Sequence, residues 1–330
     1  MKQTIFVFSS GEVKRINNTL CFVSTTGKKY IPIENVGEMM FFGEVSMDKK
    51  LLEFVSKNEI LLHFFNYYGY YVGTYYPREH YNSGFMILKQ SEHYSDNAKR
   101  ILIAKKFVSG AVLNILRVLA YYKNRGIDLS EVIESINRLS SEISKADDIE
   151  VLMSYEGNIR NQYYKAFNSI IDNSMFKFET RTRQPPETMI DALISFGNSL
   201  LYTVTLSEIY KTHLDPRIGF LHSTNFRRFT LNLDVSEIFK PVLVDRTIFT
   251  LLNKNILKQS HFIKELNGVY LNEEGRKEFV KEFQSKLDTT ISHSKLRRNV
   301  SYRTLIRMEL YKLEKYLMEG EEYVPFEARW

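Results

Sequence analysis

The sequence is poor in residues on which several common kinds of protein depend. Its 330 residues contain one cysteine, Cys21, so an internal disulfide and a thiolate metal cage are both excluded. The first ten residues lack the pattern of a signal peptide, and we expect a cytoplasmic protein. The most apolar stretch, Met189 to Leu206, contains Asp191 and Asn198, which favours a buried helix of a soluble domain over a membrane span.

Several catalytic signatures are absent as well. Gly-x-Ser-x-Gly, Gly-x-x-x-x-Gly-Lys-Ser/Thr and His-Glu-x-x-His do not occur, so the commonest motifs of serine hydrolases, P-loop NTPases and zinc proteases are missing. The sequence also has no internal repeat and no low-complexity segment. What remains is an ordinary globular composition, 44% hydrophobic and 25% charged, which is sufficient to bury a core.

Positive charge is present in modest excess, with a formal net charge of +6. That value alone favours a polyanionic partner only weakly. Its placement is more informative, because the segment between Asp288 and Glu309 has no acidic residue but several basic ones. They are Lys295, Arg297, Arg298, Arg303 and Arg307. We predict a local basic surface here.

The hydrophobic pattern changes near residue 76. Before it, short apolar runs separated by turn residues predict strands, with one helix capped by Ser46 or Asp48. The predicted strands cover residues 4–8, 19–24, 29–33, 38–42, 60–65 and 70–75. After it, apolar residues recur with the period of a helix. The predicted helices cover residues 98–122, 130–143, 147–172, 187–212, 235–252, 273–289 and 299–318.

These patterns predict an α+β protein. A small β-rich N-terminal domain over residues 1–76 is followed by a linker over 77–92 and by a larger all-helical domain over 93–330. The long helix over 98–122 is expected to end at Arg125-Gly126, because glycine is favoured just past a helix C-terminus.

A carboxylate interrupts the apolar stripe of the helix predicted over 147–172. Glu156 stands where the helical period requires a core residue between Leu152 and Ile159. Burying an unpaired carboxylate is costly, so Glu156 needs a partner. An ion pair with Arg160, one turn further on, is one explanation. A metal ligand or a general base is the other.

A second group of residues combines one histidine with two acids. The run Gly219–His222 ends on the imidazole, and Asp234 and Glu237 follow at the start of a predicted helix. Because residues three apart lie on one helix face, both carboxylates can point the same way. Alternatively, the two acids cap the helix and interact with its dipole, and His222 is a core residue with satisfied hydrogen bonds.

Taken together, one imidazole and two or three carboxylates form a mixed nitrogen and oxygen ligand set. Such a set suits Mg²⁺ or Mn²⁺ better than a structural zinc ion, and such an ion suits phosphodiester chemistry. Basic and aromatic residues are interleaved with the acids, as expected for phosphate contacts and base stacking, although for any one of them taken singly an ordinary surface or core role is the better explanation. The candidate nucleic-acid contacts are Arg160, Tyr164, Arg181, Arg183, Arg227, Arg228, Lys240, Arg246, Arg298 and Arg303.

At these residues the sequence resembles the CRISPR-associated integrase family, the first core Cas protein, and most closely its members from type I systems. The resemblance extends over the whole chain and rests on the order and spacing of several fragments. They are Phe41–Val45, His63–Tyr71, Tyr76–Glu79, Glu156-Gly157 with Arg160 and Tyr164, Arg181, Arg183, Pro185-Pro186, Gly219–His222, Leu233–Pro241, Asp245-Arg246 and Ser301–Arg303.

The resemblance implies a β-rich N-terminal dimerisation domain and a helical catalytic domain. It further implies a homodimer, a small ferredoxin-like partner (the second core Cas protein), and double-stranded DNA in the form of protospacer and CRISPR repeat. Its metal ligands map onto Glu156, His222 and Glu237, which would also be the catalytic residues, with Mg²⁺ or Mn²⁺ as cofactor. Many members have Asp where this chain has Glu237. Asp234 matches the first acid of the pair and is expected to be an accessory ligand or to support one.

The implied activity is metal-dependent DNA integration and cleavage in CRISPR adaptation. The 3′-hydroxyl of a short foreign DNA attacks a phosphodiester bond of the CRISPR array, and with water as nucleophile the same site is an endonuclease. Two alternatives are a non-catalytic scaffold that binds nucleic acid and a general structure-specific, metal-dependent nuclease.

Overall fold

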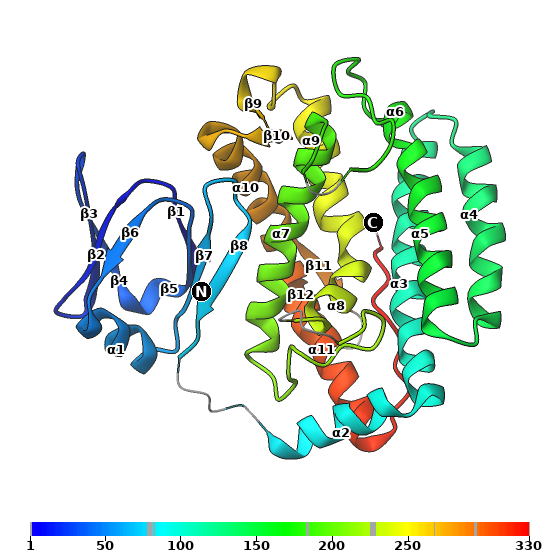
Figure 1. The fold of residues 1–330 in the computed structure, drawn as a ribbon, viewed down its shortest axis with the longest axis horizontal. Helices are drawn as coiled ribbons and strands as arrows, with labels where there is room; N and C mark the ends of the chain where they lie inside the picture. Colours follow the sequence, from blue (N-terminus) through cyan, green and yellow to red (C-terminus); the bar gives the residue numbers. More distant parts are fainter. Residues whose placement is uncertain are drawn as a thin grey trace. The chain divides into compact units, whose positions relative to one another are not determined.

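The computed structural model describes residues 2–77, 81, 83–182, 185–224, 229–266, 268–293 and 296–329. The chain forms two compact units, Met1–His80 and Tyr81–Trp330, which Figure 1 shows as a strand-rich and a helix-rich part. The predicted fold class, a small β-rich region followed by a larger helical one, is confirmed.

The first unit contains two four-stranded sheets and one α-helix. One sheet has the order β1 (Gln3–Val7), β5 (Val36–Phe41), β7 (Leu61–Phe65), β8 (Tyr71–Tyr75), and the other has the order β4 (Gly27–Pro32), β3 (Thr19–Ser24), β2 (Gly11–Ile16), β6 (Val45–Met47). A 3₁₀ turn, η1 (Ile33–Asn35), precedes β5. Helix α1 (Lys49–Lys57) begins at Asp48, whose side chain accepts a hydrogen bond from the Leu51 amide at 2.8 Å. Of the two predicted caps, Ser46 and Asp48, the residue that caps the helix is therefore Asp48.

Two strands of this unit, β2 and β6, are not predicted from the sequence. In β2 only Val13 is buried, so the strand lacks the alternating apolar pattern by which strands are recognised. Strand β6 has three residues, too few to show a period. The core lies between the sheets and α1 and is formed by apolar side chains such as Val13, Val36, Phe41 and Val55.

The second unit is mainly helical. Its α-helices are α2 (Gly84–Ser95), α3 (Asn97–Lys123), α4 (Ser130–Glu142), α5 (Ile149–Lys165), α6 (Phe167–Ile170), α7 (Met189–Ile209), α8 (Leu231–Lys240), α9 (Arg246–Asn253), α10 (Glu273–Asp288) and α11 (Tyr302–Glu319). Short 3₁₀ turns cover η2 (Ile143–Lys145) and η4 (Gln259–His261), and η3 (Pro241–Asp245) is a π-helical turn.

Three details of the predicted second domain are wrong. It is not all-helical, because β9 (Phe262–Glu265) pairs with β10 (Gly268–Leu271) and β11 (Thr290–His293) with β12 (Arg298–Ser301). The linker predicted over 77–92 contains most of α2, which packs against α3 and α11. The helix predicted over 235–252 is divided into α8 and α9 by η3, where Pro241 has no amide hydrogen to donate.

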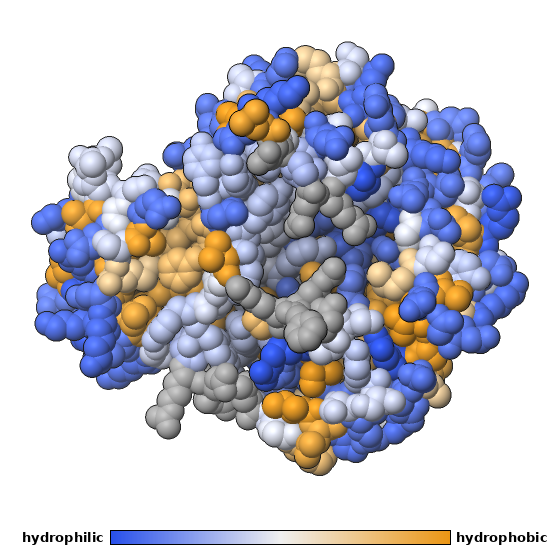
Figure 2. All heavy atoms as spheres, in the orientation of Figure 1, coloured by the Kyte–Doolittle hydropathy of each residue, from blue (hydrophilic) through white to orange (hydrophobic). Residues whose placement is uncertain are grey.

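Helix α8 lies at the centre of this unit and packs against α3, α7 and α11 (Figure 1). All its residues except Leu233 are buried. Helix α7 is long and apolar enough to cross a membrane, but most of it is buried in the unit, as expected for a core helix. By contrast, the outer surface over α4 is mostly hydrophilic (Figure 2).

Candidate active site

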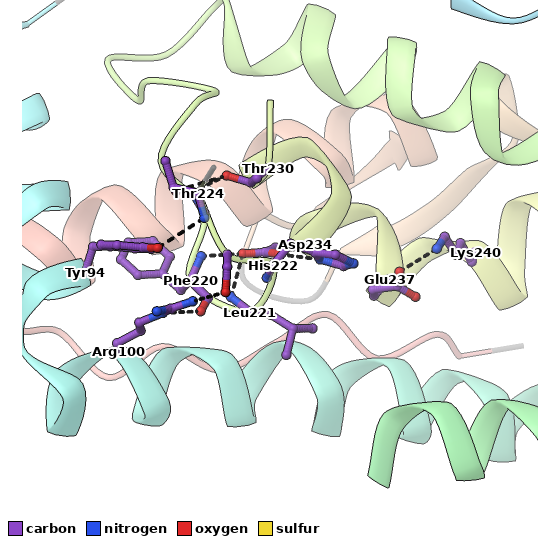
Figure 3. A network of polar contacts seen from close by, with 12 residues as sticks. Tyr94, Arg100, Phe220, Leu221, His222, Thr224, Thr230, Asp234, Glu237 and Lys240 are labelled. Carbon is purple, nitrogen blue, oxygen red and sulfur yellow. Dashed lines mark hydrogen bonds and ion pairs between the residues drawn. The ribbon is translucent and has the colours of Figure 1, made fainter. Parts of the chain in front are cut away.

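The loop that carries His222 is wrapped around the carboxylate of Asp234. This carboxylate accepts hydrogen bonds from the backbone amides of Phe220, Leu221 and His222 at 2.5, 2.9 and 2.9 Å, and its Oδ1 is 2.8 Å from His222 Nδ1 (Figure 3). Asp234 is fully buried. A Cβ on Gly219 would come within 2.8 Å of Asp234 Oδ2, so the loop needs glycine there to approach the acid this closely.

The alternative in which Asp234 caps α8 is not what the structure shows. The residue before the helix is Thr230, and the Asp234 side chain reaches the 219–222 loop instead. Because the Asp234 carboxylate can only accept, Nδ1 of His222 carries the hydrogen and donates it to Asp234. In the neutral imidazole, the other ring nitrogen, Nε2, then has the free lone pair. A carboxylate behind a histidine in this way is the usual support of a metal-binding imidazole.

Glu237 lies one helical turn beyond Asp234 and is held by two cations. Its Oε2 accepts a hydrogen bond from Arg160 Nη2 at 2.8 Å, and its Oε1 accepts one from Lys240 Nζ. Burial alone would raise the pKa of Glu237, but Lys240 and Arg160 outweigh burial and lower this pKa to about 2. Glu237 is therefore a carboxylate at neutral pH.

Glu156 approaches the same place from α5. Its Oε1 is 3.7 Å from Arg160 Nε, so the predicted ion pair one turn along the helix is present. Burial and then the Glu237 carboxylate raise the pKa of Glu156, while Arg160, Lys240 and His222 oppose the rise. Glu156 and Glu237 therefore share Arg160, and the charges of Glu237 and His222 both act on the pKa of Glu156.

His222 carries the opposite perturbation. Burial would lower its pKa, but the hydrogen bond and the charge of Asp234, followed by the charge of Glu237, raise it. The side chain of His222 is 21% exposed, whereas Asp234 behind it is inaccessible. His222 is thus the accessible member of this pair.

Arg160 connects the acids through the interior. Besides Glu156 and Glu237, it faces Asp245, with 3.8 Å between Nη1 and Oδ2. Asp245 lies at the end of the π-helical turn, and burial raises its pKa to about 6 despite Arg160 and Lys240. Three acids (Glu156, Glu237, Asp245) thus surround two permanent cations. When all three are ionised, the group has one uncompensated negative charge.

The donor set of this site fits a small divalent cation. Two glutamates and an imidazole nitrogen are ligands that Mg²⁺ and Mn²⁺ accept, and the negative charge favours a cation. Within the described ranges, no three His, Cys, Asp or Glu side chains are gathered at metal-ligand geometry. Arg160 and Lys240 each hold one oxygen of Glu237.

The predicted nucleic-acid contacts fall into three groups. Arg183, Arg227 and Arg228 lie outside the described residues. Arg160 and Tyr164 are buried at 7% and 6% exposure and have partners inside the unit: Arg160 lies between carboxylates, and Tyr164 packs against Phe167 and Phe178.

Four of the remaining candidates have protein partners. Arg181 pairs with Asp191 at 2.9 Å and donates to Ser195, Lys240 pairs with Glu237, and Arg246 lies over the Tyr121 ring at 5.0 Å. Arg303 pairs with Glu208 at 3.4 Å. Arg298 is exposed on β12.

Several residues that build the site were missed. Arg100 donates to the Phe220 carbonyl at 2.8 Å and stacks on Tyr94, whose hydroxyl accepts from the Thr224 amide, so α2 and α3 hold the His222 loop (Figure 3). Neither residue interrupts a pattern, and the sequence offered no signal. Asn114 did offer one, since it is a polar residue on the apolar face of α3.

Asn114 ties helix α8 to the C-terminal segment of the chain. Its Nδ2 donates to the carbonyls of Ile238 and Phe326 at 2.9 and 3.0 Å, and its Oδ1 accepts from the Ala328 amide at 2.8 Å. Ile238 is the residue after Glu237. The extended segment over 320–329, which shows no periodicity in the sequence, therefore supports α8.

Comparisons with known proteins agree on one family. The model of the family described as "CRISPR associated protein Cas1" matches residues 5–285. A CRISPR-associated endonuclease Cas1 of Thermodesulfovibrio yellowstonii is 58% identical over 330 residues, which is 100% of both chains. The CRISPR-associated endonuclease Cas1 of Thermotoga maritima is 49% identical over 97% of this chain and 98% of the relative.

Solved structures give the same result. A Cas1 protein from Thermotoga maritima superposes with a TM-score of 0.88 at 47% identity, covering 98% of this chain and 100% of that one. A casposase bound to integration product has the same fold, with a TM-score of 0.88 at 20% identity, covering 100% and 95%. The chain belongs to the Cas1 family of CRISPR-associated endonucleases.

Proposed function

We propose that this chain inserts short foreign DNA into a CRISPR array with a divalent ion held by Glu156, His222 Nε2 and Glu237. The observation that carries the proposal is the Asp234–His222 contact of 2.8 Å, which leaves Nε2 as the lone-pair nitrogen, while Arg160 holds Glu156 and Glu237 together at 3.7 and 2.8 Å. Bound there, Mg²⁺ or Mn²⁺ would neutralise phosphate charge and stabilise the leaving oxygen.

The reaction is a transesterification. The 3′-hydroxyl oxygen of the incoming strand forms a bond to phosphorus, the bond from phosphorus to the 3′-oxygen of the array strand breaks, and that oxygen leaves with the electron pair. The proton of the attacking hydroxyl passes to solvent. With water as the nucleophile, the same displacement is strand cleavage, the endonuclease activity named for the relatives.

In this reaction the protein supplies position and charge. Glu156 and Glu237 provide oxygen ligands, and Asp234 fixes the tautomer and orientation of His222. Arg160 keeps the two glutamates together, with contacts of 3.7 and 2.8 Å to them. We assign no ligand role to Asp234, because its oxygens already accept four hydrogen bonds from the 220–222 loop.

The proposed partners follow from family membership. One fold relative is a casposase bound to integration product and another is a Cas6-RT-Cas1–Cas2 complex, with a TM-score of 0.86 at 17% identity. For this chain we propose double-stranded DNA, a homodimer joined through the strand-rich unit, and the small ferredoxin-like second core Cas protein. The proposed place of action is the cytoplasm, and the relation to type I systems remains a prediction.

Strand transfer tests the proposal. A labelled oligonucleotide with a free 3′-hydroxyl is incubated with a supercoiled plasmid that carries the repeat, with Mn²⁺ or with chelator, and with the second core Cas protein. Joined product should require the ion and disappear in Glu156→Gln and His222→Ala, while Glu150→Gln, an exposed residue of the same helix α5, should join normally. Product formation by the two site variants would contradict the catalytic assignment. Cleavage without joining would favour a general nuclease.

A further inference from the structure

The Lys240 ammonium binds an oxygen of Glu237 that a metal ion could also bind. The ammonium donates to Glu237 Oε1, while Arg160 holds Oε2 at 2.8 Å. Both cations are largely buried, with Lys240 at 9% and Arg160 at 7% exposure. An ion approaching Glu237 must therefore replace one of these two contacts.

Arg160 is the less replaceable of the two. It is fixed by further carboxylates, with Glu156 at 3.7 Å and Asp245 at 3.8 Å. Its planar guanidinium matches several acids at once, whereas a lysine ammonium is a point charge on a flexible stem. The only carboxylate with which Lys240 pairs among the described residues is Glu237, so Lys240 can leave without exposing a second buried acid.

The ammonium already has a second contact beside Glu237. Lys240 Nζ lies 5.0 Å from the centre of the Tyr202 ring on α7, a distance at which the ring face attracts a cation. An ion that takes the Glu237 oxygen therefore leaves the ammonium with its contact to Tyr202.

We infer that Lys240 is an exchangeable cation: a divalent ion binds Glu237 by displacing the Lys240 ammonium, and the displaced ammonium then contacts a DNA phosphate. The inference rests on the proposed metal site. It makes ion binding and a phosphate contact one coupled event, so that the protein gains a DNA contact only where the catalytic ion is bound. The coupling is reciprocal, and bound DNA should in turn favour the ion.

The first test is Mn²⁺ affinity measured by calorimetry on the full chain without DNA. Lys240→Gln removes the competing charge and should tighten Mn²⁺ binding by about three- to tenfold. Lys312→Gln is the matched control, because Lys312 pairs with the buried Glu309 at the same three-residue spacing, and it should bind Mn²⁺ like the wild type. Glu237→Gln reports on the site itself and should weaken binding.

The outcomes separate the two claims. Weaker or unchanged Mn²⁺ binding by Lys240→Gln, together with loss of binding in Glu237→Gln, would overturn the exchange and leave the proposed site intact. Wild-type Mn²⁺ binding by Glu237→Gln would overturn the site, and the exchange with it.

The second test measures DNA binding as a function of salt. A duplex with 3′-phosphate ends, which has no hydroxyl to join, is titrated by fluorescence anisotropy over a range of NaCl. With Mn²⁺, the slope of log affinity against log salt should be steeper in the wild type than in Lys240→Gln by about 0.9, one phosphate contact. Without Mn²⁺ the two slopes should agree. Equal slopes with Mn²⁺, or a difference that is already present without it, would overturn the coupled phosphate contact.

Discussion

The helical unit contains two clusters of charged side chains around buried carboxylates, and the net charges of the two clusters have opposite signs. The acid cluster contains Glu156, Glu237 and Asp245 around Arg160 and Lys240. The cation cluster contains one acid, Glu208 of α7, and the three basic residues Lys211, Arg303 and Arg307. With all groups ionised, the first carries one net negative charge and the second two net positive charges.

The pKa shifts reflect the same difference. Burial would raise the pKa of Glu208, but its three cations outweigh burial and lower it. In the acid cluster, burial and the neighbouring carboxylate raise the pKa of Glu156. Comparison of the two clusters shows that burial alone does not determine the role of an acid. An excess of acids creates a site for a cation, and an excess of cations creates a surface suited to phosphate.

The largest expected effect comes from removing one negative charge from the acid cluster. Glu237→Gln should lower strand transfer at least about 100-fold, because it takes away an ion ligand. Glu237→Asp, which keeps the charge, should retain activity within about tenfold. Gel assays of joined product would measure both, and equal activity of the Gln and Asp variants would remove the charge argument for this cluster.

Next in size is the support of the histidine. Asp234→Asn keeps the shape but loses the charge that holds His222 Nδ1–H, and it should reduce Mn²⁺ affinity or strand transfer by about 10- to 100-fold. Circular dichroism should show an intact fold, which distinguishes orientation of the imidazole from unfolding. A variant with wild-type ion affinity and activity would show that this contact only holds the loop.

In the cation cluster, loss of the acid should lower the stability of the fold. Glu208→Gln leaves three cations without their carboxylate and should cost about 1–3 kcal/mol of unfolding free energy at pH 7. Since the folded-state pKa of Glu208 is lowered, this contribution is complete above the ordinary value of about 4.3 and is lost as pH falls below it. Thermal melts of both proteins at pH 7 and pH 3.5 would measure the gap, and a gap that grows in acid would contradict this sign.

The smallest effect should come from one surface cation. Arg303→Gln should decrease the salt slope of DNA binding by about 0.9 and leave Mn²⁺ affinity unchanged. Arg138→Gln, exposed on α4, is the control. If Arg303→Gln changed ion affinity and not the slope, the division of labour between the clusters would be wrong.

The sequence predicted what depends on local pattern. The change from strand runs to helical period placed both units, and Glu156 was identified because a carboxylate interrupted an apolar stripe. The two hairpins and α2 were missed, since β9 to β12 have four residues each and α2 follows a segment rich in turn residues.

Contacts between distant segments could not be predicted in the same way. Glu237 meets Arg160 across 77 positions, and Asn114 meets Phe326 across 212. No spacing rule relates such residues, because tertiary packing brings them together. The sequence could therefore place the acids on their helices, but only the fold shows that Arg160 holds Glu237 and that Asp234 supports the His222 loop.

The most direct test of the account is the position of a bound ion. Crystals of the full chain soaked in Mn²⁺ should show one anomalous peak bounded by Glu156, His222 Nε2 and Glu237, with the Lys240 ammonium moved off Glu237. A peak elsewhere, or none in crystals that bind Mn²⁺ in solution, would contradict the proposed site.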